Sequence, residues 1–426
     1  MSVVFILCLI FFIMLINKVI FKSYITFESV LPLFYLVLLF FLSSGLYLER
    51  EISVISLSVV ILFSVVFYAV SFFTLGFCNK KSSTNEIVLN EKSLSRYLSA
   101  FSLFLLFYIA YYVPEALQLM LVDSIANYRS SINGFGDDGS VLFGKGIELF
   151  VYQFFFKGIL VSVSIVSSVI FHIRNVKLPI YIVTLVILLD CIVSFGRFIL
   201  YYHFVTFVVV GFIYSKLNIR KLLLSTSLLL IFIVVFTLFR FENFSDLVSV
   251  VVRNIVGYHV FGFALFDYYL TENMPEVIDV DGLVFLANFQ YILQKIINIF
   301  GYNLNTFMST DNYRDLSEFV FLGKDVFDNN VYANAFYTNL LDFYLDAGVF
   351  SVLVYTVIIS SLYSFLLFKV KSENSILCVF LFSYLFLIVY FGVFNSQLLL
   401  MRNVFSLLFL VFLYFLFFKK YKWSLK

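Results

Sequence analysis

Residues 403–420 read NVFSLLFLVFLYFLFFKK, an apolar run that ends in two lysines. At about 1.5 Å per residue, such a run approaches the length that a helix needs to cross a hydrocarbon layer about 30 Å thick. Lysines that flank a span favour the cytoplasmic side of the membrane. The run therefore predicts a membrane-spanning helix with the C-terminus of the chain in the cytoplasm.

Similar apolar runs recur along the whole chain. Of its 426 residues, 62% are hydrophobic and 13% are charged, and the mean hydropathy is +1.03. No soluble core absorbs that much apolar surface, so we predict an all-α polytopic membrane protein with a single integral membrane domain, residues 1–426. The eleven predicted spans lie near residues 2–21, 30–48, 52–77, 97–122, 147–171, 179–195, 198–214, 222–239, 340–368, 376–394 and 403–418. A weakly hydrophobic twelfth crossing within residues 282–300 is an alternative.

The distribution of basic residues predicts the orientation of these spans. Counting backwards from a cytoplasmic C-terminus places seventeen of the 28 Lys and Arg residues in short cytoplasmic segments. This asymmetry is what the positive-inside rule requires. The same count places residues 123–146 and 240–333 on the opposite face of the membrane.

One large polar segment, residues 240–333, interrupts the series of apolar spans. It carries twelve carboxylates against five Lys or Arg residues, together with many Tyr, Phe and Asn residues. A protein that only forms a pore or an anchor has little use for such an insert, whereas an enzyme at a membrane surface needs a place to hold a water-soluble substrate. We therefore predict that this loop between transmembrane helices is the working part of the chain.

Several function classes have little support. The net charge of +2 gives no indication of a nucleic-acid partner. The four cysteines are scattered without a C-x-x-C spacing, which predicts neither a disulfide nor a metal site. The acidic pairs Asp279/Asp281 and Asp325/Asp328 lack a full ligand loop for a divalent ion, so we expect solvated loop there and no cofactor.

Charged residues inside the predicted spans are the next clue. An ionised side chain at the centre of a bilayer costs about 2.5 to 3.5 kcal/mol on insertion scales, so it needs a partner or a purpose. Asp190, Glu115 and Lys157 lie within three different spans. Two interpretations stay open: Lys157 pairs with Asp190 or Glu115 between helices, or these side chains line a polar cavity.

Four arginines of the predicted outer face are candidates for a common site, namely Arg197, Arg240, Arg253 and Arg314. Guanidinium groups hold phosphate oxygens through paired hydrogen bonds and stay charged at physiological pH, so several arginines at one site suit a lipid diphosphate. The alternative is that each arginine anchors the chain to lipid headgroups. Arg197 fits that alternative least, because it lies in a very short turn on the side where positive charge is disfavoured.

Residues 253–270 (RNIVGYHVFGFALFDYYL) predict a helix that lies on the membrane surface with one apolar face. His259 in this segment is the only histidine of the outer loops. It is either a surface histidine without a function, or a substrate ligand or proton acceptor near pH 7.

The end of the insert carries a resemblance to a known family. Residues 328–348, DNNVYANAFYTNLLDFYLDAG, lead into a span and contain the pattern N-x-F-Y-x-x-L-x-D-F-Y-x-D-x-G. This pattern after a large outer loop resembles the bacterial O-antigen polymerases, which polymerise oligosaccharide repeat units. The turn SFGR at residues 194–197 is similar to a small-residue-plus-Arg turn of that family, and Arg253 followed by Gly257-Tyr258 and Gly262 resembles its loop helix. The resemblance covers roughly residues 179–395.

The resemblance implies a glycosyltransferase of GT-C-like architecture in the bacterial inner membrane. Such an enzyme transfers a growing glycan from undecaprenyl diphosphate to a new undecaprenyl-diphosphate-linked repeat unit, at an active site that faces the periplasm. It needs no cofactor, and its expected partners are the lipid bilayer, a chain-length regulator and a flippase. The predicted catalytic residues are Arg197, Arg253, His259 and Asp342. The predicted substrate-binding residues are Arg240, Tyr258, Arg314, Asn330, Asn334, Tyr337 and Asp346.

These residues divide the chemistry between them. Arg197, Arg240 and Arg253 are candidates to hold the departing diphosphate. His259, Asp342 or Asp346 is the candidate base, and the two aspartates are four residues apart on one predicted helix face. Tyr332 joins the tyrosines and asparagines named above as a candidate for the sugar groove.

Two other functions remain alternatives. An O-antigen ligase would differ only in the acceptor, but the histidine that precedes the Asn-rich motif in the ligases is matched in this chain by Ala333. A flippase or other transporter of lipid-linked oligosaccharides would predict short outer loops and pore-lining charges along both halves, which the long insert does not favour.

Overall fold

The structure is a computed structural model that describes the greater part of the chain. The described residues are 2–76, 91–122, 128, 131–132, 140–144, 146–214, 227, 231, 249, 252–272, 284–287, 289–290, 293–294, 297, 319–333, 338–373, 375–394, 397 and 400–416. Nearly all of the predicted span 222–239 and about half of the insert lie outside these residues.

The described helices have the length and composition of a polytopic membrane protein. Five are long and apolar enough to cross a membrane, Val3–Phe21, Val54–Thr74, Ser95–Val122, Ile147–Arg174 and Asn339–Ser372. Five shorter apolar helices are Phe27–Ser43, Leu178–Ser194, Phe198–Ile213, Ile376–Phe391 and Met401–Tyr414. Each coincides with a predicted span, so the helical membrane class is confirmed and ten of the eleven predicted spans are helices.

The chain divides into two compact units, each assembled from segments that are distant in sequence. Unit 1 comprises Met1–Lys80, Asn243–Phe368 and Ile388–Leu400, and unit 2 comprises Lys81–Glu242, Lys369–Leu387 and Met401–Lys426. The described parts of the predicted insert belong to unit 1, where they pack with the N-terminal helices.

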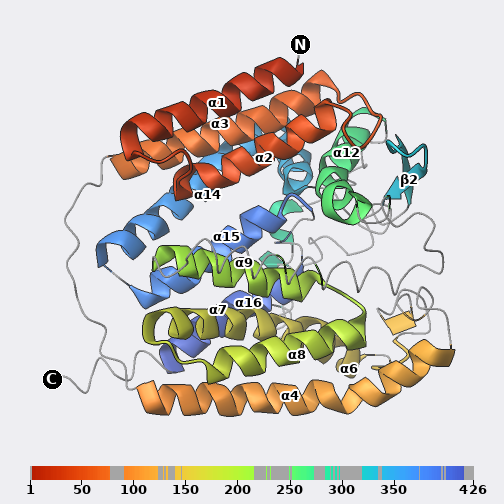
Figure 1. Cartoon of the computed structure of the whole chain (residues 1–426), viewed down its shortest axis with the longest axis vertical. Helices are drawn as coiled ribbons and strands as arrows, with labels where there is room; N and C mark the ends of the chain where they lie inside the picture. Colours follow the sequence, from red (N-terminus) through yellow and green to blue (C-terminus); the bar gives the residue numbers. More distant parts are fainter. Residues whose placement is uncertain are drawn as a thin grey trace. The chain divides into compact units, whose positions relative to one another are not determined.

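In unit 1, α1 (Ser2–Phe21), α2 (Phe27–Ser43) and α3 (Val54–Gly76) are neighbours in both sequence and space (Figure 1). The start of α2 is fixed by Ser29 Oγ, which accepts a hydrogen bond from the backbone N–H of Thr26 at 3.0 Å and so completes the cap of the helix. The part of α14 (Asn339–Glu373) that belongs to unit 1 packs on these helices, because the Tyr363 hydroxyl donates to the Phe27 carbonyl at 2.8 Å.

The segment predicted to lie on the membrane surface is instead a core element of unit 1. It begins with a π-helical turn, η3 (Arg253–Gly257), and continues as α12 (Tyr258–Thr271), which packs against α2 and α3. Side chains on nearly all sides of α12 are buried, from Val260 to Phe266. The surface-helix prediction is therefore wrong, because apolar residues surround this helix instead of forming one stripe, and they are buried against the rest of unit 1.

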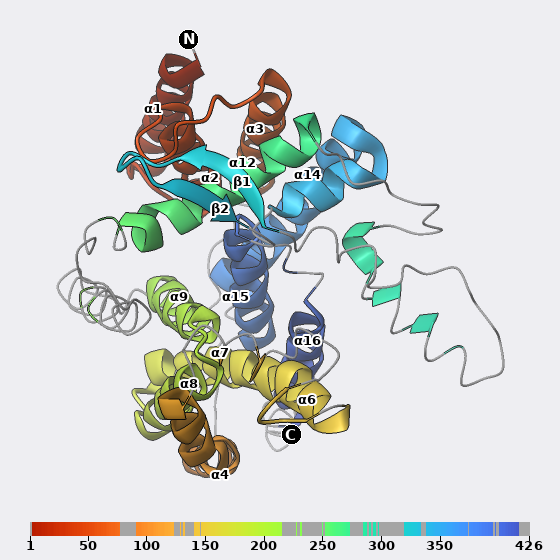
Figure 2. The same ribbon diagram turned by 90° about the vertical axis from the view of Figure 1, so that its right-hand side faces the viewer.

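A β-hairpin, which the sequence pattern did not predict, completes unit 1. Strands β1 (Val320–Lys324) and β2 (Asn330–Ala333) are antiparallel, with a register shift near Gly323. Figure 2 shows the hairpin beside α12. The α2–α3 loop extends it through a bridge between Leu48 and Asp325 and a 2.9 Å hydrogen bond from Glu49 N to Lys324 O. The hairpin alternates buried and exposed residues, so one face is fastened to the unit.

The turn of the hairpin is ordered by one of the aspartates that were expected in solvated loop. Asp325 is buried, and its Oδ1 accepts the N–H groups of Phe327 and Asn329, both at 2.9 Å. Asp328 is exposed and pairs with Lys324 at 2.6 Å. The prediction of solvated loop is therefore wrong for Asp325, because its buried carboxylate accepts hydrogen bonds from the backbone of the turn. The prediction is confirmed for Asp328, whose side chain is exposed.

The helix α14 contains a break that the predicted span did not anticipate. Ala347 and Gly348 have non-helical backbone angles, and Gly348 has φ +63°, a conformation that favours glycine. Ser351 Oγ stabilises the break, because it donates to the carbonyls of Phe343 and Gly348 and accepts from the Ala347 N–H. Asp342 and Asp346 therefore lie on a short helical segment before the break.

Unit 2 is built from α4 (Glu91–Val122), the continuous stretch α6 (Ile147–Phe150), η1 (Val151–Phe156) and α7 (Lys157–Arg174), then α8 (Leu178–Ser194), α9 (Phe198–Ile213) and α16 (Met401–Tyr414). Most of α15 (Ile376–Phe391) also belongs to unit 2. The short helix η4 (Val284–Leu286), by contrast, belongs to unit 1. Helix α7 contacts α8, α9 and α16. Small residues allow the closest approach, since Gly158 leaves no room for a Cβ, which would lie 2.7 Å from Arg402 O, and Ser162 Oγ donates to Ser406 O at 2.7 Å.

Candidate functional site

The short turn between α8 and α9 places Arg197 in unit 2. Phe195 ends α8 with a left-handed backbone (φ 46°), and Ser194 Oγ donates to the Asp190 carbonyl at 2.8 Å and accepts the Gly196 N–H at 3.2 Å. Arg197 stands at the N-cap position of α9, and only 9% of its surface is exposed. An arginine that anchors a chain to headgroups is exposed, so burial of this side chain favours a function inside the unit.

Behind this turn lies a buried polar cluster in which Tyr152 links Lys157 and Asp190. The Tyr152 hydroxyl donates to Asp190 Oδ1 at 2.7 Å, and Lys157 Nζ lies 4.7 Å from the centre of the Tyr152 ring. Asp190 is 1% exposed, and its carboxylate attracts the Lys157 ammonium. Of the two partners proposed for Lys157, Asp190 is the one in its surroundings, whereas Glu115 is exposed.

Arg402, at the start of α16, is a functional candidate that the sequence pattern did not single out. Its guanidinium carbon lies 5.8 Å from the centre of the Phe198 ring. Phe198 is the residue that follows Arg197 in the sequence. Arg402 interacts electrostatically with Lys157 and Asp190, and its side chain hydrogen-bonds Tyr202. A signal did exist, because the topology that places Arg197 on the outer face also places Arg402 at the outer end of the last span.

The residues around Arg402 are fixed by further hydrogen bonds within unit 2. Asn403 Nδ2 donates to the Tyr202 hydroxyl at 3.4 Å, and the Tyr384 hydroxyl donates to the Asn403 carbonyl at 2.8 Å. The start of α16 is therefore tied to α9 and α15. We call Lys157, Asp190 and Arg402 the cationic cluster, since it holds two cations and one carboxylate.

In unit 1, Arg253 lies beside Tyr47 of the α2–α3 loop. Gly257 makes this approach possible, because a Cβ there would lie 2.7 Å from the Tyr47 ring. Burial raises the pKa of Tyr47, and the positive charge of Arg253 opposes that shift. The neighbouring Tyr258 is half-buried, with its ring centre 5.6 Å from that of Phe261.

His259 of unit 1 lies among aromatic rings. Its ring centre is 4.7 Å from that of Phe394 and 6.4 Å from that of Phe34, both in edge-on contacts, and the side chain is half-buried. Phe34 also stacks on Tyr390 at 4.6 Å. His259 is thus held by packing against α2 and the segment that follows α15, so it is not a freely solvated surface histidine.

The two aspartates of the family-like motif have different surroundings. Asp342 is fully buried, whereas Asp346 is half-buried. Asp346 Oδ1 accepts the Val284 N–H at 2.6 Å, and Oδ2 accepts the Tyr355 hydroxyl at 2.7 Å. Asp346 Oδ1 therefore ties η4 to α14, and Oδ2 ties the part of α14 before its break to the part after it. These contacts give Asp346 a structural role that its motif did not indicate.

The remaining predicted residues fall into two groups. Asn330 and Tyr332 are exposed on β2, where the Tyr332 ring lies 5.4 Å from that of Phe321 on the paired strand. Arg240, Arg314, Asn334 and Tyr337 lie outside the described residues. Arg197 belongs to unit 2, while Arg253, His259 and Asp342 belong to unit 1. The predicted diphosphate clamp of Arg197, Arg240 and Arg253 therefore stays a prediction.

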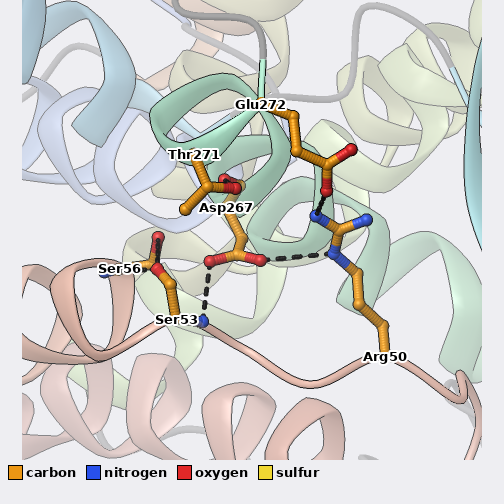
Figure 3. A network of polar contacts seen from close by, with 6 residues as sticks. All are labelled: Arg50, Ser53, Ser56, Asp267, Thr271 and Glu272. Atoms are coloured by element: carbon orange, nitrogen blue, oxygen red, sulfur yellow. Dashed lines mark hydrogen bonds and ion pairs between the residues drawn. The ribbon is translucent and has the colours of Figure 1, made fainter.

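A second ionic network, drawn in Figure 3, fastens the insert to the N-terminal helices of unit 1. Arg50 Nε contacts Asp267 Oδ2 at 3.2 Å, and Arg50 Nη2 contacts Glu272 Oε1 at 2.7 Å. Asp267 Oδ1 also accepts the Ser53 N–H at 2.9 Å. This network explains how a charged residue is accommodated in the buried helix α12, because every charge in it has a partner.

The described part of the chain contains no group of three or more His, Cys, Asp or Glu residues that could hold a metal ion. Comparisons with known proteins identify no relative of this chain: no family model, no curated protein and no solved structure matches it.

Proposed function

We propose that this chain polymerises undecaprenyl-diphosphate-linked oligosaccharide repeat units into O-antigen polysaccharide at the periplasmic face of the bacterial inner membrane. The proposal rests on the resemblance of residues 328–348 and 194–197 to the polymerase family and on the asymmetry of basic residues. A glycosyltransferase of GT-C-like architecture, and an association with a flippase and a chain-length regulator, belong to the same proposal.

The reaction moves a glycan between two lipid carriers. The bond between the anomeric carbon of the donor glycan and the oxygen of undecaprenyl diphosphate breaks. A hydroxyl oxygen of the new repeat unit forms the replacement bond, and its proton passes to a base. The leaving group carries away the bonding electron pair as diphosphate, so fixed cations at the diphosphate stabilise the transition state without a metal.

The observation that carries the proposal is the burial of Arg197. Only 9% of the surface of Arg197 is exposed, so its guanidinium group is largely shielded from water. In this buried position its charge attracts an anion far more strongly than it would in solvent. A diphosphate is an anion that matches the paired donors of arginine. His259 and Asp342 are the proposed candidates for the base, and Arg253 is a proposed catalytic cation of unit 1.

The direct test uses the purified full chain in liposomes that contain lipid-linked repeat units and no ion gradient. The expected result is glycan of increasing length, resolved as a ladder on a gel. Translocation of the repeat unit without lengthening would contradict the proposal and identify a transporter. Transfer of finished glycan to lipid A core, but not to a second repeat unit, would identify a ligase.

A strain that lacks this chain gives an independent test. Loss of polymerisation leaves lipopolysaccharide capped with a single repeat unit, because flipping and ligation continue. Complete absence of O-antigen would contradict the polymerase assignment, since that result follows from lost flipping or ligation.

A further inference from the structure

We propose that Arg402 and Lys157 together bind a phosphate-class anion, in a site contained within unit 2. The identification of that anion as a lipid-linked diphosphate rests on the proposed function. The site itself rests on the geometry of the cationic cluster and does not need the residues of unit 1.

The first step is that the members of the cluster lie together although they are remote in sequence. Lys157 lies inside the continuous helical stretch Ile147–Arg174, Asp190 lies in the last part of α8, and Arg402 lies in the first turn of α16. Arg402 repels Lys157 and attracts Asp190, and its guanidinium lies over the ring of Phe198. Gly158 allows this approach, because it brings α7 against the backbone of Arg402. Two cations and one carboxylate from three helices thus lie together in unit 2.

The second step is the charge balance. Among the described residues of the cluster, two cations face one carboxylate, and all three side chains are buried or half-buried, where an uncompensated charge is far more costly than in water. One oxygen of the Asp190 carboxylate already accepts a hydrogen bond from the Tyr152 hydroxyl. The excess of positive charge is what an entering anion would neutralise, and the mutual repulsion of Lys157 and Arg402 would then turn into joint attraction for the same ligand.

The third step concerns hydrogen-bond donors. Arg402 Nε is buried and has no hydrogen-bond partner within the part of the chain that the structure describes. Buried guanidinium donors are normally satisfied, so a donor without a partner marks a place where a ligand acceptor fits. Phosphate oxygens are acceptors on all sides and pair well with guanidinium groups. Asp190 is then a positioning residue that balances Lys157 and Arg402 while the anion is absent.

Binding of inorganic pyrophosphate and of geranylgeranyl diphosphate to the purified full chain in detergent tests this site. Calorimetry on the wild type and on Arg402→Gln, Lys157→Gln and Asp190→Asn supplies the comparison. Arg174→Gln is the matched control, because Arg174 is an exposed cation at the other end of α7. We expect Arg402→Gln and Lys157→Gln each to weaken binding at least tenfold, and Asp190→Asn to bind as tightly as the wild type or more tightly.

The two ligands separate the two sources of phosphate. Binding of both with the same dependence on Arg402 indicates a site for the diphosphate group itself. Binding of the prenyl diphosphate alone, lost in Arg402→Gln, indicates a site for the lipid-linked headgroup. Absence of binding by the wild type, or binding by Arg402→Gln equal to the wild type, would overturn the proposal.

Folding and function are separated by two further measurements. Arg402→Lys keeps the charge, so a variant that elutes as a single species but regains only part of the affinity supports paired guanidinium contacts. If Arg402→Gln loses the ligand while glycan length in cells is normal, the anion site stands and the polymerase proposal fails. If glycan length collapses while ligand binding is unchanged, the anion site is wrong and the polymerase proposal survives.

Discussion

At the scale of single residues, the burial of polar side chains separates functional candidates from structural ones. Arg197 is almost fully buried in a turn that faces a polar cluster, whereas Asp346 already uses both carboxylate oxygens on Val284 N and the Tyr355 hydroxyl. Both residues lie in family-like motifs of the sequence, Arg197 as a predicted catalytic residue and Asp346 as a predicted substrate-binding residue. Their contacts now predict different outcomes, with loss of activity for the first and loss of stability for the second.

Replacing Arg197 with alanine should leave an inserted protein but shorten surface polysaccharide to a single repeat unit. The physical reason is loss of charge stabilisation for the leaving diphosphate, which is worth about 10²–10³ in rate for one donor of this kind. Gel profiles at matched expression measure the effect. Arg197→Lys should rescue poorly if paired contacts are needed, and Arg174→Ala serves as the control. Normal chain lengths in Arg197→Ala would remove Arg197 from the site.

Gly257→Ala should destabilise unit 1, because the new methyl group would lie 2.7 Å from the Tyr47 ring. Overpacking of this kind costs about 1 to 3 kcal/mol. Thermal unfolding in detergent would measure it. The double variant with Tyr47→Leu should recover part of the loss, since it removes the atoms that clash. A single variant as stable as the wild type would mean that Tyr47 does not pack on this glycine.

At the scale of elements, charged contacts decide where the insert packs. The helix α12 carries Asp267 among apolar neighbours, and Arg50 of the α2–α3 loop neutralises it. The same loop pairs with the hairpin through Leu48 and Asp325. Two parts of the insert are therefore held by one short loop between the second and third helices, and that loop is expected to be intolerant of change.

Arg50→Gln should lower the free energy of unfolding by about 3 to 5 kcal/mol. The reason is that the Asp267 carboxylate, whose side chain is 3% exposed, would stay buried without its charge partner. Glu272→Gln is the internal control: its side chain is 54% exposed, so its contact with the same arginine should be worth only about 0.2 to 1 kcal/mol. Chemical unfolding of both variants measures the contrast. Equal losses would show that burial does not set the strength of these contacts.

At the scale of the whole molecule, helix composition confirms the membrane class, and the sidedness of the helices stays a prediction. Five long and five shorter apolar helices are described, and basic residues gather in alternate connections. The two units each contain helices from both halves of the chain, so contact between remote segments, and not sequence order, defines them.

Single cysteines in a background without the native cysteines can test the orientation. Asn329→Cys, in the exposed turn of the hairpin, should react with a membrane-impermeant maleimide added to the periplasmic side of intact cells whose outer membrane has been opened. Lys177→Cys, in the exposed connection between α7 and α8, should react only after lysis. The opposite pattern would reverse the topology and place the insert in the cytoplasm.

The sequence by itself determined the membrane class, the positions of ten helices and the presence of charges such as Asp190 inside those helices, because hydropathy is a local property that each span carries alone. It also pointed to the turn at Arg197. Only the tertiary structure decided that α12 is buried, that residues 320–333 form a hairpin, and that Arg402 lies with Lys157 although the two are far apart along the chain. Those results depend on which apolar surfaces and charges come into contact in the folded protein. Such contacts join residues that are distant in sequence, so the local sequence around a side chain does not identify its partners.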